Sequence, residues 1–161
     1  MAGRLRARMA AGLAVAMLLL TSAAAPGRAV AATPVAGRSA PAAPTFTVNS
    51  FADVVAAAPL DNGVCEYLPG NRVCTLRAAI MKANHYPGGG VTILLPAGTY
   101  TLTLAPSGLD DEASGDLNIT KTLTILGAGA ATTLIDANQL DRVISVGAGA
   151  TVTLANVTLR N

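Results

Sequence analysis

The sequence has little charge and few aromatic side chains. Charged residues make up 12% of the 161 residues and aromatic residues 3%, with no tryptophan and one histidine. At 52% hydrophobic residues, the composition excludes an intrinsically disordered acidic or basic chain. The scarcity of aromatic rings also leaves few platforms on which bases or sugars could stack.

Basic residues are concentrated at the beginning of the chain. The formal net charge is +2, but four of the arginines (Arg4, Arg6, Arg8 and Arg28) precede residue 32. Beyond that point seven basic residues face nine acidic ones, a net charge of −2. Because a basic patch is what attracts a phosphate backbone, we predict no nucleic-acid partner.

Residues 1–31 have the three parts of a secretory signal. An arginine-rich start is followed by an apolar run over 9–20 and by the small-residue pattern Ala29-Val30-Ala31, where we predict cleavage. A retained membrane helix would need about 20 apolar residues, more than this run offers. We therefore expect a secreted, extracellular or cell-surface protein with no membrane span after cleavage.

The rest of the chain divides into a linker and one domain. Residues 32–44 are rich in alanine and proline, and this composition predicts a disordered linker. Residues 45–161 contain nearly all the strand-forming sequence and form the predicted domain.

Two cysteines, Cys65 and Cys74, are the only ones in the chain. The segment between them contains Pro69-Gly70-Asn71, which favours a turn that would bring them together. An oxidising compartment outside the cell favours a disulfide. A metal or redox pair is the alternative, although the spacing is not that of a Cys-x-x-Cys motif.

A helix is predicted over residues 75–84. Four apolar residues recur at the spacing of one helical face: Leu76, Ala79, Ile80 and Ala83. Thr75 can cap the first turn, and Asn84 followed by 87–90 (Pro-Gly-Gly-Gly) ends the helix.

Short strands follow the helix. Alternating apolar residues bounded by turn residues predict strands at 91–95, 99–104, 117–119, 123–126, 133–135, 143–146, 152–154 and 157–159. The run Gly127-Ala128-Gly129-Ala130 recurs 20 residues later as Gly147-Ala148-Gly149-Ala150, which suggests one rung of a solenoid. The pattern lacks leucine-rich-repeat signatures and is too short for a propeller blade, so we expect an all-β parallel β-helix. The helix would cover the apolar end of its first coil.

The junction between the second cysteine and the helix carries a family resemblance. The run C-T-L-R-A-A-I resembles the C-S-L-R-E-A-I signature of the CSLREA domain, and the positions that carry the likeness are Cys74, Thr75, Leu76, Arg77, Ala79 and Ile80. Segments 46–50, 94–100, 110–111 and 115–117, together with Asp53 and Cys65, are also similar to that family. Two positions depart from the signature: Thr75 stands in place of serine and Ala78 in place of glutamate. Any role of that glutamate is therefore absent from this chain.

The resemblance covers about 45–161 and implies fold and location rather than chemistry. Proteins of this kind are exported, are typical of bacteria, and begin a right-handed parallel β-helix of the pectate-lyase-like type. The predicted fold class is therefore a right-handed parallel β-helix start with one N-terminal capping helix.

The acidic segment holds the best candidate ligands for a metal ion: Asp110, Asp111, Glu112 and Asp116. Closely spaced carboxylates could bind calcium, a hard cation that takes oxygen ligands, although the spacing is not that of an EF-hand. The alternative is a solvated turn between strands, and we expect no other cofactor.

Catalytic residues are not evident. A polysaccharide lyase would need a cation and a base, for which Arg142 and Arg160 are the available arginines, but the sequence does not place them beside the acidic segment. His85 stands at a helix end without a serine-protease-like motif. We expect a scaffold or adhesion-type protein that contacts cell-surface components or polysaccharide. The alternative is the N-terminal fragment of a polysaccharide lyase or glycoside hydrolase.

The sequence stops in or just after a predicted strand, at Leu159-Arg160-Asn161. Solenoids need several repeats and a terminal cap. We therefore expect an incomplete β-helix that exposes a strand edge and self-associates edge to edge.

Overall fold

Parallel strands dominate the structure, a computed structural model that describes residues 42–161. The predicted signal and residues 32–41 of the linker lie outside the described residues. Within them there are nine strands: β1 (Thr45–Thr47), β2 (Val91–Leu95), β3 (Gly98–Thr101), β4 (Leu117–Ile119), β5 (Leu123–Gly127), β6 (Thr133–Asp136), β7 (Ile144–Val146), β8 (Val152–Ala155) and β9 (Thr158–Arg160). The one helix of this region is α1 (Leu76–His85). The eight strands predicted after the helix correspond to β2–β9.

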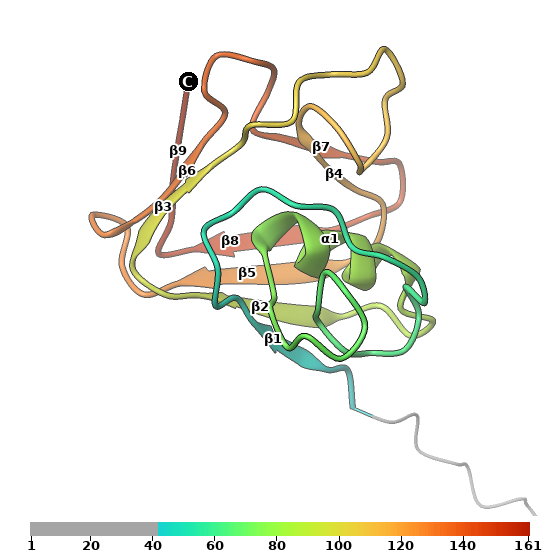
Figure 1. Ribbon diagram of the computed structural model, residues 1–161. Coiled ribbons are helices and arrows are strands. Elements are labelled where there is room, and N and C mark those ends of the chain that lie inside the picture. Colours follow the sequence, from blue (N-terminus) through green and yellow to red (C-terminus); the bar gives the residue numbers. More distant parts are fainter. Residues whose placement is uncertain (1–41) are drawn as a thin grey trace, which may run out of the picture. The chain divides into compact units, whose positions relative to one another are not determined.

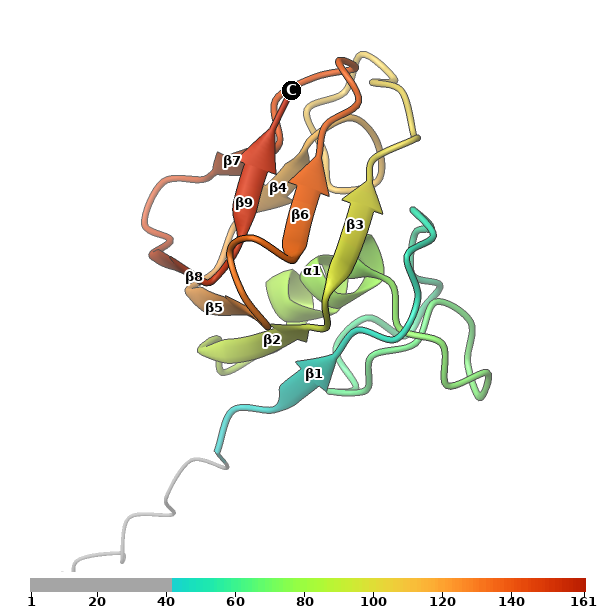
Figure 2. The ribbon, with the colours of Figure 1, turned by 90° about the vertical axis from the view of Figure 1, so that its left-hand side faces the viewer.

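The strands form three sheets, each with parallel pairing throughout. The sheet orders are β1-β2-β5-β8, β3-β6-β9 and β4-β7. From β2 onward the chain visits the three sheets in rotation, and one such passage is called a circuit below. The sheets surround a common interior, and α1 lies at one end of it (Figures 1 and 2).

The register of the pairs corrects the predicted repeat length. Between circuits, paired residues are separated by 24 positions for Leu134 and Thr158 and by 35 for Gly98 and Thr133. The two Gly-Ala-Gly-Ala runs follow strands of different sheets, β5 and β7, so they are not equivalent positions. The prediction of a 20-residue rung is wrong because the two glycine runs mark two different turns of the same circuit.

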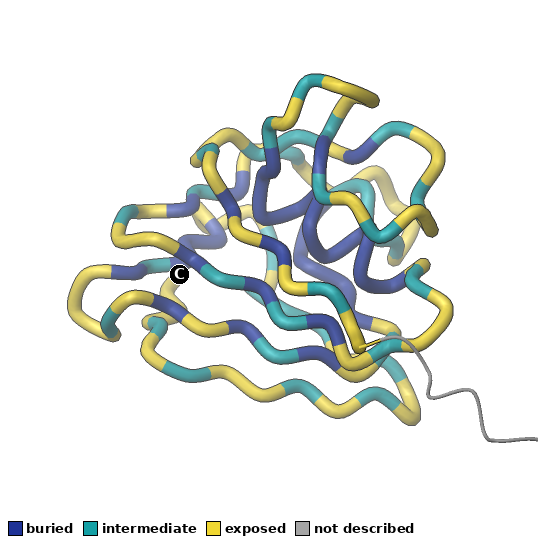
Figure 3. Tube along the Cα trace, turned by 90° about the horizontal axis from the view of Figure 1, so that it is seen from below, coloured by how far each residue is buried: buried dark blue, intermediate teal, exposed yellow. Residues whose placement is uncertain are grey.

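The strands bury alternate residues. In β2 the buried positions are Val91, Ile93 and Leu95, and Ile93 pairs in register with Ile125 of β5. This alternation is visible along the strands in Figure 3. The buried side chains form one main core that also includes Phe46, Leu117 and Ile135. Period-two patterning therefore directs one face of each sheet inward.

Helix α1 is buried on more than its apolar face. Its predicted face joins the main core through Leu76, Ala79, Ile80 and Ala83. The opposite side carries Ala78 and Met81, which pack with Ala56 in a second cluster. Figure 3 shows the helix as almost continuously buried. A helix is present at the predicted position, and the segment before the helix covers its outer side.

The segment before the helix is fixed by covalent and capping contacts. Cys65 and Cys74 form the predicted disulfide, with Cα atoms 5.2 Å apart. The hydroxyl oxygen of Thr75 accepts a hydrogen bond from Ala78 N at 3.1 Å and caps α1, as predicted. The same hydroxyl donates to Val54 O at 2.7 Å, so the cap also holds the covering segment.

No helix among the described residues is long and apolar enough to cross a membrane.

Tyr100 of β3 packs on Phe51 and bonds to the turn between β2 and β3. Its ring lies 5.1 Å from that of Phe51, and its hydroxyl donates to Pro96 O at 2.9 Å. A Cβ at Gly98 would lie 2.6 Å from Phe51 Cζ, and the φ of Gly98 is +153°. A side chain at Gly98 would therefore displace the aromatic pair. Burial raises the pKa of Tyr100 to about 12.

We predict that one of the three tyrosines ionises far above pH 10. Because the raised pKa of Tyr100 favours the neutral phenol in the folded state, its contribution to stability is complete below pH 10 and is lost as the pH rises through about 12. Absorbance at 295 nm, followed from pH 8 to 13, should show this late step. The step should vanish in Tyr100→Phe, and its persistence in that variant would assign it to another tyrosine.

Candidate functional site

Arg77 lies at the junction of the helix with the loop that joins β3 and β4. It is only 1% exposed. Its Nε donates to Asp53 Oδ1 at 2.6 Å and its Nη2 donates to Asp53 Oδ2 at 3.2 Å, which makes a two-point ion pair. The remaining donors reach three main-chain carbonyl oxygens, those of Glu112, Gly115 and Asp116. The guanidinium is thus fully bonded inside the protein.

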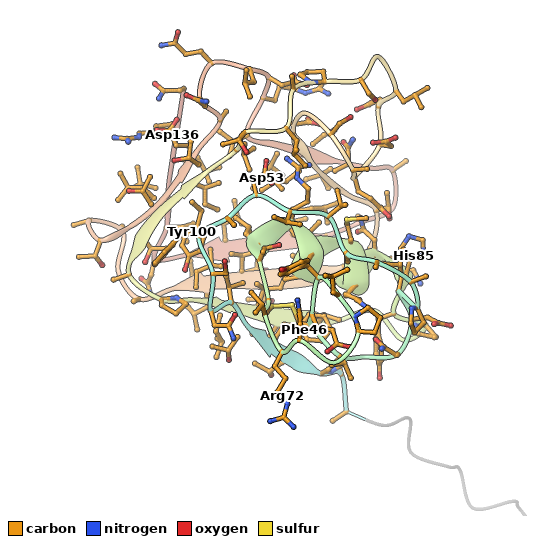
Figure 4. The ribbon with its side chains drawn as sticks, in the orientation of Figure 1. Phe46, Asp53, Arg72, His85, Tyr100 and Asp136 are labelled. Carbon is orange, nitrogen blue, oxygen red and sulfur yellow. A yellow bond between two sulfur atoms is a disulfide. The ribbon has the colours of Figure 1, made fainter. Side chains whose placement is uncertain are left out.

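Asp53 extends this network to a third segment. Its Oδ2 accepts hydrogen bonds from Thr103 N at 2.8 Å and Leu104 N at 3.0 Å. Strand β3 was predicted to reach Leu104 but ends at Thr101. Leu102 N still donates to Asp136 O of β6 at 2.8 Å, but Asp53 takes the N–H groups of Thr103 and Leu104, which are therefore not available to a neighbouring strand. Figure 4 shows Asp53 directly beside α1.

A second basic side chain of the helix is also buried. Lys82 is 1% exposed, and its Nζ donates to Pro59 O and, at 3.5 Å, to Asn62 Oδ1. Both partners belong to the segment that covers the helix. Arg77 and Lys82 therefore hold α1 to the chain on either side of it.

Two carboxylates of the acidic segment share Arg142 as a partner, and a third is bonded within its own turn. Asp116 is buried and accepts from Arg142 Nε at 2.8 Å. Exposed Asp110 lies 3.4 Å from Arg142 Nη2. Asp111 Oδ1 accepts from the main-chain N of Ala113 at 2.9 Å. The hydrogen bond that Arg142 donates to Asp116, followed by the negative charge of Asp116, raises the pKa of Arg142.

Glu112 joins the acidic segment to the end of the helix. Its Oε1 lies 2.7 Å from His85 Nε2, and its Oε2 accepts from Asn84 Nδ2 at 2.8 Å. Asn84 also donates to Asn118 O and accepts from Thr120 N, both in the β4 region. Figure 4 shows His85 at the outer end of α1. A carboxylate only accepts, so Nε2 of His85 carries the hydrogen in this pair.

These groups surround a pocket of about 620 Å³. Its walls are the end of the helix, the acidic segment, β4 with the residue after it, and the β7 region. The lining residues are Met81, His85, Asp110, Asp111, Glu112, Ala113, Asn118, Ile119, Thr120, Ser145 and Gly147. No lysine or arginine is among them, so the pocket is acidic.

The four predicted calcium ligands do not converge on one point. Asp110, Asp111 and Glu112 line the pocket, whereas Asp116 is buried and bonded to Arg142. Among residues 42–161, no three His, Cys, Asp or Glu side chains form a group that could hold a metal ion. The arrangement gives no support to a calcium site. Asp110 is exposed and Asp111 is half-buried, whereas Asp116 is buried and bonded to Arg142.

Arg142 and Arg160, whose positions relative to the acidic segment the sequence did not predict, lie in different parts of the fold. Arg142 is beside the acidic segment, as described above, and Arg160 lies 2.9 Å from Asp136 on the neighbouring strand β6. Asp136 also accepts from Asn138 N at 2.9 Å and Asn161 Nδ2 at 2.7 Å. The Asn138 main-chain bond, followed by the Asn161 and Arg160 bonds, lowers the pKa of Asp136.

Acid should weaken the contacts around Asp136. Since its folded-state pKa lies below the unfolded value, Asp136 adds stability above about pH 4 and loses it as the pH falls through the folded-state pKa. We predict that Asp136→Asn lowers the melting temperature at pH 6 and that the difference from wild type shrinks towards pH 2.5. A difference that stays constant over this range would contradict the assignment.

Sequence reasoning missed the residues that build the pocket floor. Asn118 and Ser145 were not singled out as functional residues, and His85 was identified only as a residue at the helix end. The His85–Glu112 pair joins residues 27 positions apart, and no local pattern in the sequence predicts it.

The described residues thus define a protein of mostly parallel β-strands in three sheets, with one buried helix and an open acidic pocket. No protein family, no curated protein and no solved structure matches the chain.

Proposed function

We propose that this protein is an exported scaffold or adhesion-type protein whose domain, of the CSLREA type, begins a right-handed parallel β-helix. Two features support the fold assignment. Every pair of strands is parallel, and the chain passes through three sheets in a fixed rotation. This alternation of short parallel strands and turns is typical of a β-solenoid.

The observation that carries the proposal is the closed end at α1. The helix packs on the core, the segment before it packs on the helix, and the Arg77–Asp53 pair fastens both to the β3–β4 loop. A solenoid needs such a cap, because its first coil would otherwise expose apolar side chains and an open strand edge. The buried pair Arg77–Asp53 therefore supports a structural role rather than a catalytic one.

The surface pocket is poorly suited to an acidic polysaccharide. Three carboxylates line it without a lysine or arginine. A uronate chain would bring further negative charge to this surface and be repelled. The exposed arginine beside this segment, Arg142, is bonded to Asp116 and Asp110, and Arg77 is buried in its own ion pair. A polysaccharide lyase, which needs a cation to hold the sugar acid, therefore finds no support at this site.

Incubation with polysaccharides tests the proposal. The protein would be mixed with polygalacturonate and alginate, with and without calcium, next to a pectin-degrading enzyme as positive control. We expect no rise in absorbance at 235 nm, which reports unsaturated ends, and no new reducing ends. Either product, lost again in Glu112→Gln but kept in the control Asp61→Asn, would overturn the non-catalytic assignment.

Export requires a separate experiment. The full chain and a variant lacking residues 2–31 would be expressed in a bacterial host and followed by immunoblotting of cells and medium. We expect export of the full chain together with loss of its first 31 residues, and retention of the truncated variant. Uncleaved chain in the membrane fraction would instead identify residues 9–20 as part of an anchor.

A further inference from the structure

Asn62 and Gly63 form the one Asn-Gly dipeptide in the sequence. They lie in the segment that covers the outer side of α1, where Asn62 is exposed and Gly63 is half-buried. An asparagine followed by glycine can react with its own main chain, because the next residue has no Cβ to hinder the approach of its N to the side-chain carbonyl carbon. This dipeptide is therefore a candidate site of covalent change in the covering segment.

The side chain of Asn62 is folded back over the peptide that follows it. Its Oδ1 accepts a hydrogen bond from Val64 N at 3.1 Å, which makes an Asx turn. In such a turn the side-chain carbonyl lies beside the main-chain N of the next residue, here Gly63. The N–H of Gly63 donates no hydrogen bond within residues 42–161, so no contact of this kind holds it away from the Asn62 side chain.

Lys82 places a second donor on the same oxygen. Its Nζ lies 3.5 Å from Asn62 Oδ1, although the residue is only 1% exposed. Its other partner, the carbonyl oxygen of Pro59, is also neutral. In the part of the chain that the structure describes, no carboxylate makes an ion pair with Lys82. A buried ammonium with only neutral partners stabilises negative charge beside it, and such charge can develop on Asn62 Oδ1.

We propose that Asn62 is a site of intramolecular deamidation, which supplies Lys82 with a carboxylate partner. Gly63 N loses its proton to hydroxide, attacks Asn62 Cγ and forms a C–N bond. The negative charge of the tetrahedral intermediate lies on Oδ1, where the Lys82 ammonium and Val64 N–H stabilise it. The Cγ–Nδ2 bond then breaks, and the leaving nitrogen takes a proton from water and departs as ammonia. Water opens the succinimide ring that remains, to give aspartate or isoaspartate.

The aspartate product changes the contacts of the covering segment. It keeps an oxygen for Val64 N and adds a negative charge beside Lys82. The resulting ion pair joins the covering segment to α1, as the Arg77–Asp53 pair already does elsewhere. We expect Asn62→Asp, which mimics this product, to melt at a higher temperature than wild type. The same substitution should give no gain in a Lys82→Met background.

Peptide mapping of the full chain, kept for weeks at neutral pH, tests the proposal. We expect the peptide that contains Asn62 to gain about 1 Da and to appear in aspartate and isoaspartate forms. Asn71 is the matched control within the same chain, because its Oδ1 also accepts from the N–H two residues on, that of Val73, at 3.0 Å. Asn71 is followed by Arg72 instead of glycine, and Lys82 does not reach it. It should convert at least about tenfold more slowly.

Lys82→Met measures the contribution of the lysine. It removes the charge and keeps a flexible, unbranched side chain inside the protein. We expect deamidation at Asn62 to slow at least about threefold, because the intermediate loses one of its two donors. Lys121→Met is the control, since Lys121 is the other lysine of the chain and donates to Tyr86 O. Circular dichroism would establish that both variants are folded.

Each outcome supports or overturns the proposal. An unchanged Asn62, or equal conversion of Asn62 and Asn71, would overturn it in the wild-type protein alone, whether or not Lys82→Met folds. Equal rates in Lys82→Met and Lys121→Met would overturn the role of Lys82. Loss of about 17 Da, with Asn62 and Lys82 in one joined peptide, would overturn it as well, because Lys82 rather than Gly63 would then have displaced the ammonia.

Discussion

Arg77→Met should lower the free energy of unfolding by about 3–5 kcal/mol, the cost of leaving one member of a buried ion pair alone. Asp53 would lose its cationic partner while its side chain is only 2% exposed. The carbonyl oxygens of Glu112, Gly115 and Asp116 would also lose their donors. Because domains of this size are stable by only about 5–15 kcal/mol, urea unfolding should show a large shift of the midpoint.

A double-mutant cycle separates the charge from the packing. In Arg77→Met/Asp53→Asn no uncompensated charge remains, so the double variant should lose less than the sum of the two single variants. Arg72→Met is the control, since Arg72 is exposed and points away from the fold in Figure 4. Additive losses would show that the two side chains act independently.

Gly127→Ala should destabilise the protein by about 2–3 kcal/mol, whereas Gly147→Ala should change stability by less than about 1 kcal/mol. A Cβ at Gly127 would overlap the carbonyl oxygen of Asn156 and lie 2.7 Å from Val157 Cγ1, both in the next circuit. At Gly147 the nearest atom is Ile119 O at 3.4 Å. The two glycines occupy the same position in their Gly-Ala-Gly-Ala runs, so each variant serves as the control for the other.

Thermal and urea unfolding of both glycine variants would measure this difference. Equal losses would mean that both runs are constrained by turn geometry. A larger loss of stability in Gly127→Ala would instead show that glycine is required there because the next circuit packs closely against it.

The strands, the helix, its cap and the disulfide could be predicted because their signals are local. Alternating apolar residues, the Thr75 cap and the turn between the two cysteines each lie within about ten residues of sequence. The repeat length could not be obtained in this way. It depends on the lengths of the turns between sheets. Gly127 and Gly147 look alike in sequence, although Gly127 ends β5 and Gly147 follows β7, a strand of a different sheet.

The site was largely beyond prediction for a related reason. Arg77 lies in a helix whose apolar face was evident, but its partners are 24 residues earlier and 35 to 39 residues later. Likewise, Arg142 reaches Asp116 only because β4 pairs with β7 in one particular register. Contacts of this kind follow from the pairing of strands, and the pattern of charges does not encode them.

The parallel stacking of the strands has a mechanical consequence. β1 is the first strand of its sheet and β9 the last of another, so a force applied between them pulls across the hydrogen bonds that join successive strands. Those bonds would then be loaded one row at a time, and the protein should lengthen in small steps at modest force rather than break in a single event. The disulfide and the Arg77–Asp53 pair tie the segment after β1 to the helix, so we expect the rows nearest β9 to yield first.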